Sequence, residues 1–142
     1  MSPRTWTLEL PFDRPPLSLN ARQHHMAVYR IRQQIIEAVH WQAIAQRLPK
    51  NLDHVGIVLH WQATVKRSRD TDNPAPTLKA CIDALAGGRG KRRGYGLVVD
   101  DDSEHVTSGV VIEQLAAEPR MWLEIHDLSA VPANPNGAGE TK

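Results

Sequence analysis

The sequence predicts one α+β (or α/β) domain, in which a mixed β-sheet carries about two helices. Three observations support this fold class. The 142 residues suit a single domain of a size that can bury a core. Segments in which apolar and polar residues alternate, as in strands, take turns with segments of helical period. Their order reads β-α-β-α-β-β-β over residues 1–128, and the small, polar residues 129–142 are expected to form a disordered tail.

The first two elements differ clearly in period. Apolar residues alternate from Trp6 to Phe12, which predicts a strand, and turn-forming residues follow at 13–16. From Met26 to Leu48, apolar residues recur at spacings of three, four and seven, with polar residues between them. This pattern predicts a long amphipathic helix that ends at Pro49.

The second strand and the second helix are separated by a proline-containing link. Val55–Val65 alternates most regularly in the sequence and predicts a strand, which Pro74 and Pro76 prevent from continuing. Thr77 can cap a short helix over Leu78–Leu85, because threonine at this position can accept a hydrogen bond from a free backbone N–H.

The last third of the chain predicts three more strands. Leu97–Val99 is a short apolar run, and Val106–Leu115 and Met121–Ile125 are expected to be two closing strands joined by a turn around Pro119.

Composition excludes several classes of protein. No apolar run approaches the roughly 20 residues that a membrane-spanning helix needs, and Met1–Pro11 lacks the layout of a signal peptide. Cys81 is the sole cysteine, so an internal disulfide and a CxxC zinc site are excluded, and it is expected to lie in the core. We therefore expect a cytoplasmic protein without membrane partners.

Acidic residues follow two of the predicted strands. Asp70 and Asp72 are two positions apart, so in extended chain they point to the same face, and Asp100–Asp102 follow Leu97–Val99. If these strands are neighbours, the carboxylates converge. Two carboxylates about 4 Å apart repel by roughly 4 kcal/mol at an effective dielectric near 20, unless a cation compensates them. The pattern suits Mg²⁺, with Mn²⁺ as an alternative; turn residues and a solvated loop are the competing interpretations.

Basic residues form two clusters although the net charge is only +1. One lies at 66–69, just before Asp70, and the other at 89–93. Basic clusters beside an acidic one suit a phosphate-bearing substrate that meets a bound cation. Tyr95, which follows the second cluster, is a candidate for stacking on an unpaired base.

Four ordered motifs resemble the RusA family of Holliday-junction resolvases. The resemblance covers about Thr7 to Ile125. The motifs are Arg69-Asp-Thr-Asp-Asn73, Lys79-Ala-Cys-Ile-Asp83-Ala-Leu85, Val99-Asp-Asp-Asp102 with Val106, and Pro16-Leu-Ser-Leu-Asn20-Ala-Arg22.

The resemblance implies a homodimer, encoded by a bacterium or a phage, that cuts four-way DNA junctions in a metal-dependent reaction with one nick per subunit. Its catalytic aspartates correspond to Asp70, Asp72 and one member of Asp100–Asp102, and its helix lysine to Lys79. Two spacings to Val106 are possible, selecting Asp100 with Asp101 or Asp101 with Asp102. Since Asp101 is common to both, it is the predicted third ligand.

These residues form a mechanistic hypothesis. Asp70, Asp72 and Asp101 bind Mg²⁺, which activates the water that attacks the phosphate. Lys79 stabilises the developing charge or orients the water, and an i,i+4 ion pair with Asp83 is the alternative role for it. Asn73 can hold an aspartate in place. The predicted contacts to the DNA backbone are Arg67, Arg69, Lys91, Arg92 and Arg93.

Two other functions remain open at the level of sequence. One is a less selective nuclease for branched DNA on the same fold, and the other is a DNA-binding protein without catalysis. His24, His25 and His105 are weaker candidates for metal ligands, because a site already rich in carboxylates does not need them.

Overall fold

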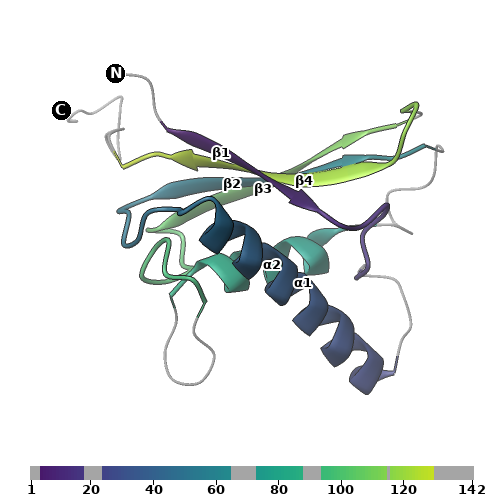
Figure 1. Cartoon of the computed structure of the whole chain (residues 1–142), viewed down its shortest axis with the longest axis horizontal. Coiled ribbons are helices and arrows are strands. Elements are labelled where there is room, and N and C mark those ends of the chain that lie inside the picture. The colour runs from purple at the N-terminus through teal and green to yellow at the C-terminus, as the bar shows by residue number, and fades with distance from the viewer. Residues whose placement is uncertain (1–3, 18–23, 65–72, 88–93, 115, 130–142) are drawn as a thin grey trace.

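Four strands and two helices make up the described part of the chain (Figure 1). The computed structural model describes residues 4–17, 24–64, 73–87, 94–114 and 116–129. In chain order, the elements are β1 (Thr5–Leu10), α1 (His25–Ala45), β2 (Val55–Gln62), α2 (Ala75–Leu85), β3 (Val106–Glu113) and β4 (Arg120–Asp127).

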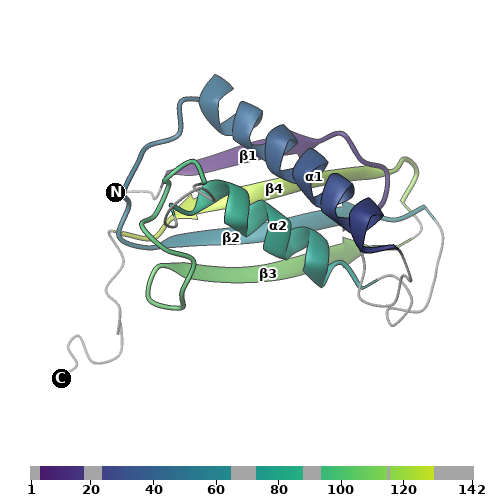
Figure 2. The ribbon, with the colours of Figure 1, turned by 90° about the horizontal axis from the view of Figure 1, so that it is seen from below.

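The strands form one mixed sheet in the order β1-β4-β2-β3. β4 pairs antiparallel with both β1 and β2, whereas β2 and β3 are parallel. Figures 1 and 2 show both helices on the same face of this sheet. The chain therefore forms a single compact α+β domain with a mixed sheet and two helices, as predicted.

The alternating strand residues have one buried side, which faces the helices. On β2 the side chains of Val55, Ile57 and Leu59 are fully buried, and on β4 those of Leu123 and Ile125. Burying one such side chain stabilises the fold by roughly 1.5–3 kcal/mol. The helices contribute further fully buried residues, both large ones and small ones that allow close packing: Ile35, Val39, Ala43, Ala80, Cys81, Ala84 and Leu85.

The two closing strands form as predicted, but they do not pair with each other. β3 and β4 lie on opposite sides of β2, which pairs with both of them. A parallel pair requires a crossover connection, and α2 provides it between β2 and β3. The apolar β2 is thereby buried at the centre of the sheet, and β3 becomes an edge strand.

The predicted strand at Leu97–Val99 is wrong. This segment makes one isolated parallel bridge, between Ala86 and Val98, and its backbone pairs instead with the end of α2. Leu97 N donates to Leu85 O (2.9 Å), and Gly87 N donates to Val98 O (2.7 Å). Leu97 and Val98 are fully buried. The run is apolar because it packs as a buried loop, which has the same sequence signature as a short strand.

Helix α1 ends at Ala45, three residues before the predicted end. Arg47 adopts a left-handed conformation with φ of 54°. Leu48 N then donates to Ala43 O, and Arg47 N to Ile44 O, both at 3.1 Å. This is the Schellman arrangement that closes many helices. The reversal at Arg47, rather than Pro49, ends the helix.

Helix α2 begins at Ala75, earlier than predicted. Ala75 N donates to Asn73 Oδ1 (2.9 Å), and Pro76 is tolerated because first-turn residues need no backbone donor. Thr77 is therefore inside the helix and fully buried. It does not cap α2: its hydroxyl donates to Leu17 O (2.7 Å) and accepts from Leu17 N (3.1 Å). Thr77 thus ties the segment after β1 to α2.

The predicted tail lies outside the described residues except for Ser129, whose hydroxyl accepts hydrogen bonds from Asp53 N (3.0 Å) and His54 N (3.4 Å). Within the described ranges, neither helix combines the length and apolar character needed to cross a membrane.

Candidate active site beside helix α2

The structure describes two of the four predicted catalytic residues, Lys79 and Asp101. Asp70 and Asp72 lie outside the described residues. The same is true of all five predicted DNA contacts, Arg67, Arg69, Lys91, Arg92 and Arg93. The geometry of the candidate site is therefore that of α2 and the loop that precedes β3.

Lys79 and Asp101 are in direct contact. Lys79 Nζ donates to Asp101 Oδ2 at 2.5 Å, a contact between residues 22 positions apart. The side chain of Lys79 is 61% exposed and that of Asp101 is 34% exposed. The loop that holds Asp100–Asp102, called the acidic loop below, thus packs beside α2. The pair of Lys79 and Asp101 remains open to a ligand from solvent.

A second carboxylate also contacts Lys79. Asp83 Oδ1, one helical turn further along α2, lies 3.0 Å from Lys79 Nζ. Asp83 Oδ2 in turn forms an ion pair with the guanidinium of Arg32 on α1. The predicted i,i+4 pair and the contact with Asp101 therefore coexist. Three successive ion pairs, between Asp101 and Lys79, Lys79 and Asp83, and Asp83 and Arg32, thus join the acidic loop to both helices.

The pair keeps both of its groups ionised. The hydrogen bond from Lys79 lowers the pKa of Asp101, and partial burial opposes this shift. The hydrogen bond to Asp101 raises the pKa of Lys79, while burial acts in the opposite direction and Asp83 adds to the rise. Because Lys79 is largely exposed, solvent screens the pair, and its effect on stability is small, typically about 0–1 kcal/mol.

The three consecutive aspartates have different partners. Asp100 Oδ1 accepts from Asp101 N (2.8 Å), which shapes the turn. Asp102 Oδ1 accepts from Glu104 N (3.1 Å) and lies 2.5 Å from His105 Nδ1. The bond to Asp102 raises the pKa of His105. Of the three, Asp101 is the one whose carboxylate contacts Lys79, and it is also the residue common to both spacings considered from the sequence.

Asn73 and His24 accept hydrogen bonds from backbone amides at the starts of the two helices. Asn73 Oδ1 accepts from the first amide of α2, as described above. His24 Nδ1 accepts from Met26 N (3.2 Å) at the start of α1, and its ring stacks on His25 with centroids 4.4 Å apart. His24 and Asn73 thus stabilise the first turns of the two helices.

Tyr95 is not available for stacking on a base. It is 9% exposed, and its hydroxyl donates to Leu48 O. Lys50 Nζ lies 3.8 Å from the ring centroid and also donates to Tyr95 O (2.7 Å). His40 meets the ring edge-on. The tyrosine fastens the loop after α2 to the end of α1, so the prediction of base stacking was wrong.

Sequence reasoning overlooked Arg32 and the anchoring role of Thr77. Arg32 lies on the side of α1 that faces α2. Because this side is partly buried, a charged arginine there requires an acidic partner. Its position in the helical period was therefore a signal for an interhelical ion pair. Thr77 stands among apolar residues of α2, where a buried hydroxyl requires a hydrogen-bond partner. Neither partner, Asp83 or Leu17, is identifiable from sequence spacing.

The carboxylates of this region have the donor chemistry that Mg²⁺ and Mn²⁺ require, since both ions prefer hard oxygen ligands. Over the ranges that the structure describes, no three His, Cys, Asp or Glu side chains form a group able to hold a metal ion. A site of three aspartates would thus combine Asp101 with residues outside those ranges.

Comparison with protein-family models gave no matching family, and comparison with curated proteins gave no match.

Proposed function

We propose that this chain is a Mg²⁺-dependent endodeoxyribonuclease that resolves Holliday junctions in DNA recombination and repair, in the manner of the RusA family. The contact between Lys79 and Asp101 is the observation that carries the proposal. These residues come from separate motifs, which resemble that family independently of each other. One active site requires both residues to lie together, and in the folded chain they do.

Asp101 would hold the cation together with Asp70 and Asp72, and Mn²⁺ could replace Mg²⁺. The bound ion would supply an activated nucleophile and stabilise charge on the attacked phosphate. The ammonium of Lys79 would stabilise negative charge that develops on the phosphate oxygens. Asp83 also pairs with Lys79 and is itself paired with Arg32.

The proposal assigns the DNA contacts to basic side chains, because phosphates are attracted to positive charge. The backbone of a branched DNA would be bound by Arg67, Arg69, Lys91, Arg92 and Arg93, and each of two subunits would make one nick. We place this activity in the cytoplasm of a bacterium, from a bacterial or phage gene.

The test is cleavage of a synthetic four-way junction with and without Mg²⁺, compared with flap and linear duplex DNA. We expect junction cutting that EDTA abolishes. Asp101→Asn should reduce it by about a hundredfold or more, as typically follows the loss of an essential charged group. Asp72→Asn should have a similar effect. Asp100→Asn is the matched control, since Asp100 contacts the adjacent backbone, and should retain activity within about threefold.

The outcomes separate the competing functions. Equal cutting of flap, duplex and junction would indicate a less selective nuclease. Tight binding of the junction without cutting, in either Mg²⁺ or Mn²⁺, would indicate a DNA-binding protein and would overturn the proposal. Loss of activity in Asp100→Asn but not in Asp101→Asn would mean that Asp100, and not Asp101, is the third ligand.

A further inference from the structure

Helix α1 carries a line of exposed apolar side chains. Met26, Tyr29, Trp41 and Ile44 are 48%, 56%, 63% and 46% exposed, and they are four of the seven large hydrophobic residues exposed in the described part of the chain. Figure 1 shows the N-terminal turns of α1 running away from the sheet. Exposed apolar residues concentrated on one element are typical of an interaction surface rather than of scattered surface residues.

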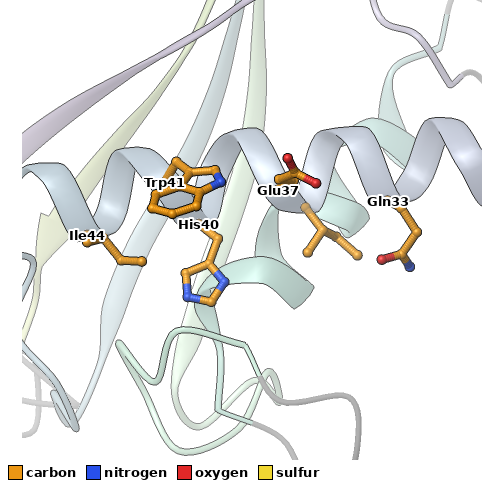
Figure 3. Close-up of a pocket in the computed structure, with 6 residues that line it drawn as sticks. Gln33, Glu37, His40, Trp41 and Ile44 are labelled. Atoms are coloured by element: carbon orange, nitrogen blue, oxygen red, sulfur yellow. The ribbon is translucent and has the colours of Figure 1, made fainter.

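The C-terminal half of this line borders a shallow groove. Its lining residues are Gln33, Ile36, Glu37, His40, Trp41 and Ile44. Figure 3 shows the labelled members projecting from successive turns of α1. The surface thus offers both protruding side chains, such as Trp41, and a depression beside them.

The exposed apolar residues are arranged symmetrically about position 35, and the exposed Arg30 lies among them, with the half-buried His40 at its mirror position. Met26 and Ile44 lie nine positions on either side of it, and Tyr29 and Trp41 lie six positions on either side. Gln33 and Glu37, both exposed, lie two positions on either side. Apolar ends therefore flank a polar centre over about 27 Å of helix, from the rise of about 1.5 Å per residue.

We propose that α1 is a dimer interface, on which α1 of a second copy packs antiparallel about a two-fold axis near position 35. Met26 and Tyr29 of each chain then lie level with Ile44 and Trp41 of the second copy, forming one apolar cluster at each end. At the centre, the amide of Gln33 faces the carboxylate of Glu37 of the second copy and can donate to it. An isologous interface needs such a self-complementary patch, in which residue i meets j and j meets i.

The chemistry of the surface favours a second copy over DNA. The groove is lined by three apolar side chains, one amide, one carboxylate and one imidazole, without lysine or arginine. DNA-binding surfaces are instead rich in these cations. An unrelated partner would not require apolar pairs at equal distances from one centre, whereas a two-fold axis does.

The oligomeric state of the protein is measured without DNA or metal. A failure of the α1 interface is therefore distinguishable from a failure of the proposed nuclease function. The catalytic variant Asp101→Asn should remain a dimer, because Asp101 lies on the loop beside α2 and not on the exposed side of α1.

Sedimentation equilibrium tests the interface directly. The wild-type protein should have twice the chain mass of 15.9 kDa at about 20 µM, a concentration well above the Kd of a typical specific dimer. The double variant Trp41→Glu, Ile44→Glu should be a monomer at the same concentration. The matched control is Val111→Glu on β3, which places the same charge at a side chain that is 50% exposed, and it should remain a dimer. A monomeric wild type, or dissociation of the control alone, would overturn the proposal.

Cross-linking tests the register and keeps the proposal falsifiable if the double variant does not fold. Met26→Cys and Ile44→Cys proteins are unfolded together, refolded and treated with a short bismaleimide. The buried Cys81 should not react. The mixture should give covalent dimers, and Met26→Cys alone should give few. Efficient cross-linking of Met26→Cys alone would mean parallel helices, and absence of any cross-link in a dimeric sample would place the interface elsewhere.

Discussion

Arg32 on α1 forms an ion pair with Asp83 on α2, and the same carboxylate group lies 3.0 Å from Lys79 Nζ. Both partners are shielded, since the side chain of Arg32 is 32% exposed and that of Asp83 is 24% exposed. The pair therefore links the packing of the two helices to the position of the lysine in the candidate active site.

Replacing Arg32 with Gln should lower the free energy of unfolding by about 1–2 kcal/mol, because Asp83 would lose a charged hydrogen-bond partner in a partly buried place. Urea denaturation at neutral pH measures the change. Arg120→Gln is the matched control, since Arg120 is paired with Glu9 at an exposed position where solvent screens the charges, and it should lower the free energy of unfolding clearly less than Arg32→Gln does. An equal loss in both variants would contradict a special role for the pair of Arg32 and Asp83.

Replacing Lys79 with Met should affect the reaction far more than the fold. Its side chain is largely exposed, so the midpoint of thermal unfolding should change by only a few degrees, consistent with a loss of under about 1 kcal/mol. Cleavage of a four-way junction should fall by about a hundredfold, as is typical when a group that stabilises transition-state charge is removed. Gel-shift binding of the same junction in Ca²⁺ should change little. Cleavage within twofold of wild type would remove Lys79 from the catalytic site.

The sequence predicted the elements well because the sheet has a single buried face. Leu8 and Leu10 on β1, and Leu59 on β2, are buried where alternation placed them. Periodicity reports which side of an element is buried, and it does not identify the neighbouring strand. Periodicity therefore did not show that β3 and β4, which follow each other in the chain, both pair with β2.

The candidate site was predictable only in part, for related reasons. Spacing left Asp100, Asp101 and Asp102 nearly equivalent, since adjacent residues of one loop share one sequence environment. Their different partners depend on how that loop lies against α2, which places Asp101 on Lys79. The ion pair of Arg32 with Asp83 joins residues 51 positions apart and depends on the packing of two helices. The roles of Asp70 and Asp72 stay predictions.

Cys81 should be chemically inert in the folded protein. It is fully buried, and burial raises the pKa of its thiol to about 12. Since the thiolate is the reactive form, reaction with Ellman's reagent at pH 8 should be slow in buffer and rapid in denaturing urea. The rate of native labelling should fall further in any variant that stabilises the fold. Labelling in buffer at the rate of a free cysteine would show that the helix face around Cys81 is open to solvent.

The pair of Lys79 and Asp101 should stabilise the fold only within a defined range of pH. The pKa of Asp101 is lowered in the folded state, so its contribution is present above the ordinary value of 3.8 and is lost as the pH falls through the folded value. The pKa of Lys79 is raised, so its contribution is present below 10.5 and is lost as the pH rises through the folded value. The difference in unfolding free energy between wild type and Asp101→Asn should therefore be constant from about pH 5 to pH 9 and should become smaller in stronger acid.

Urea denaturation of both proteins over this range measures the difference, and a second comparison on the background of Lys79→Gln isolates the contribution of the pair. On that background the substitution of Asp101 should lose most of its effect near pH 7. An undiminished effect there would mean that Asp101 is held by a group other than Lys79.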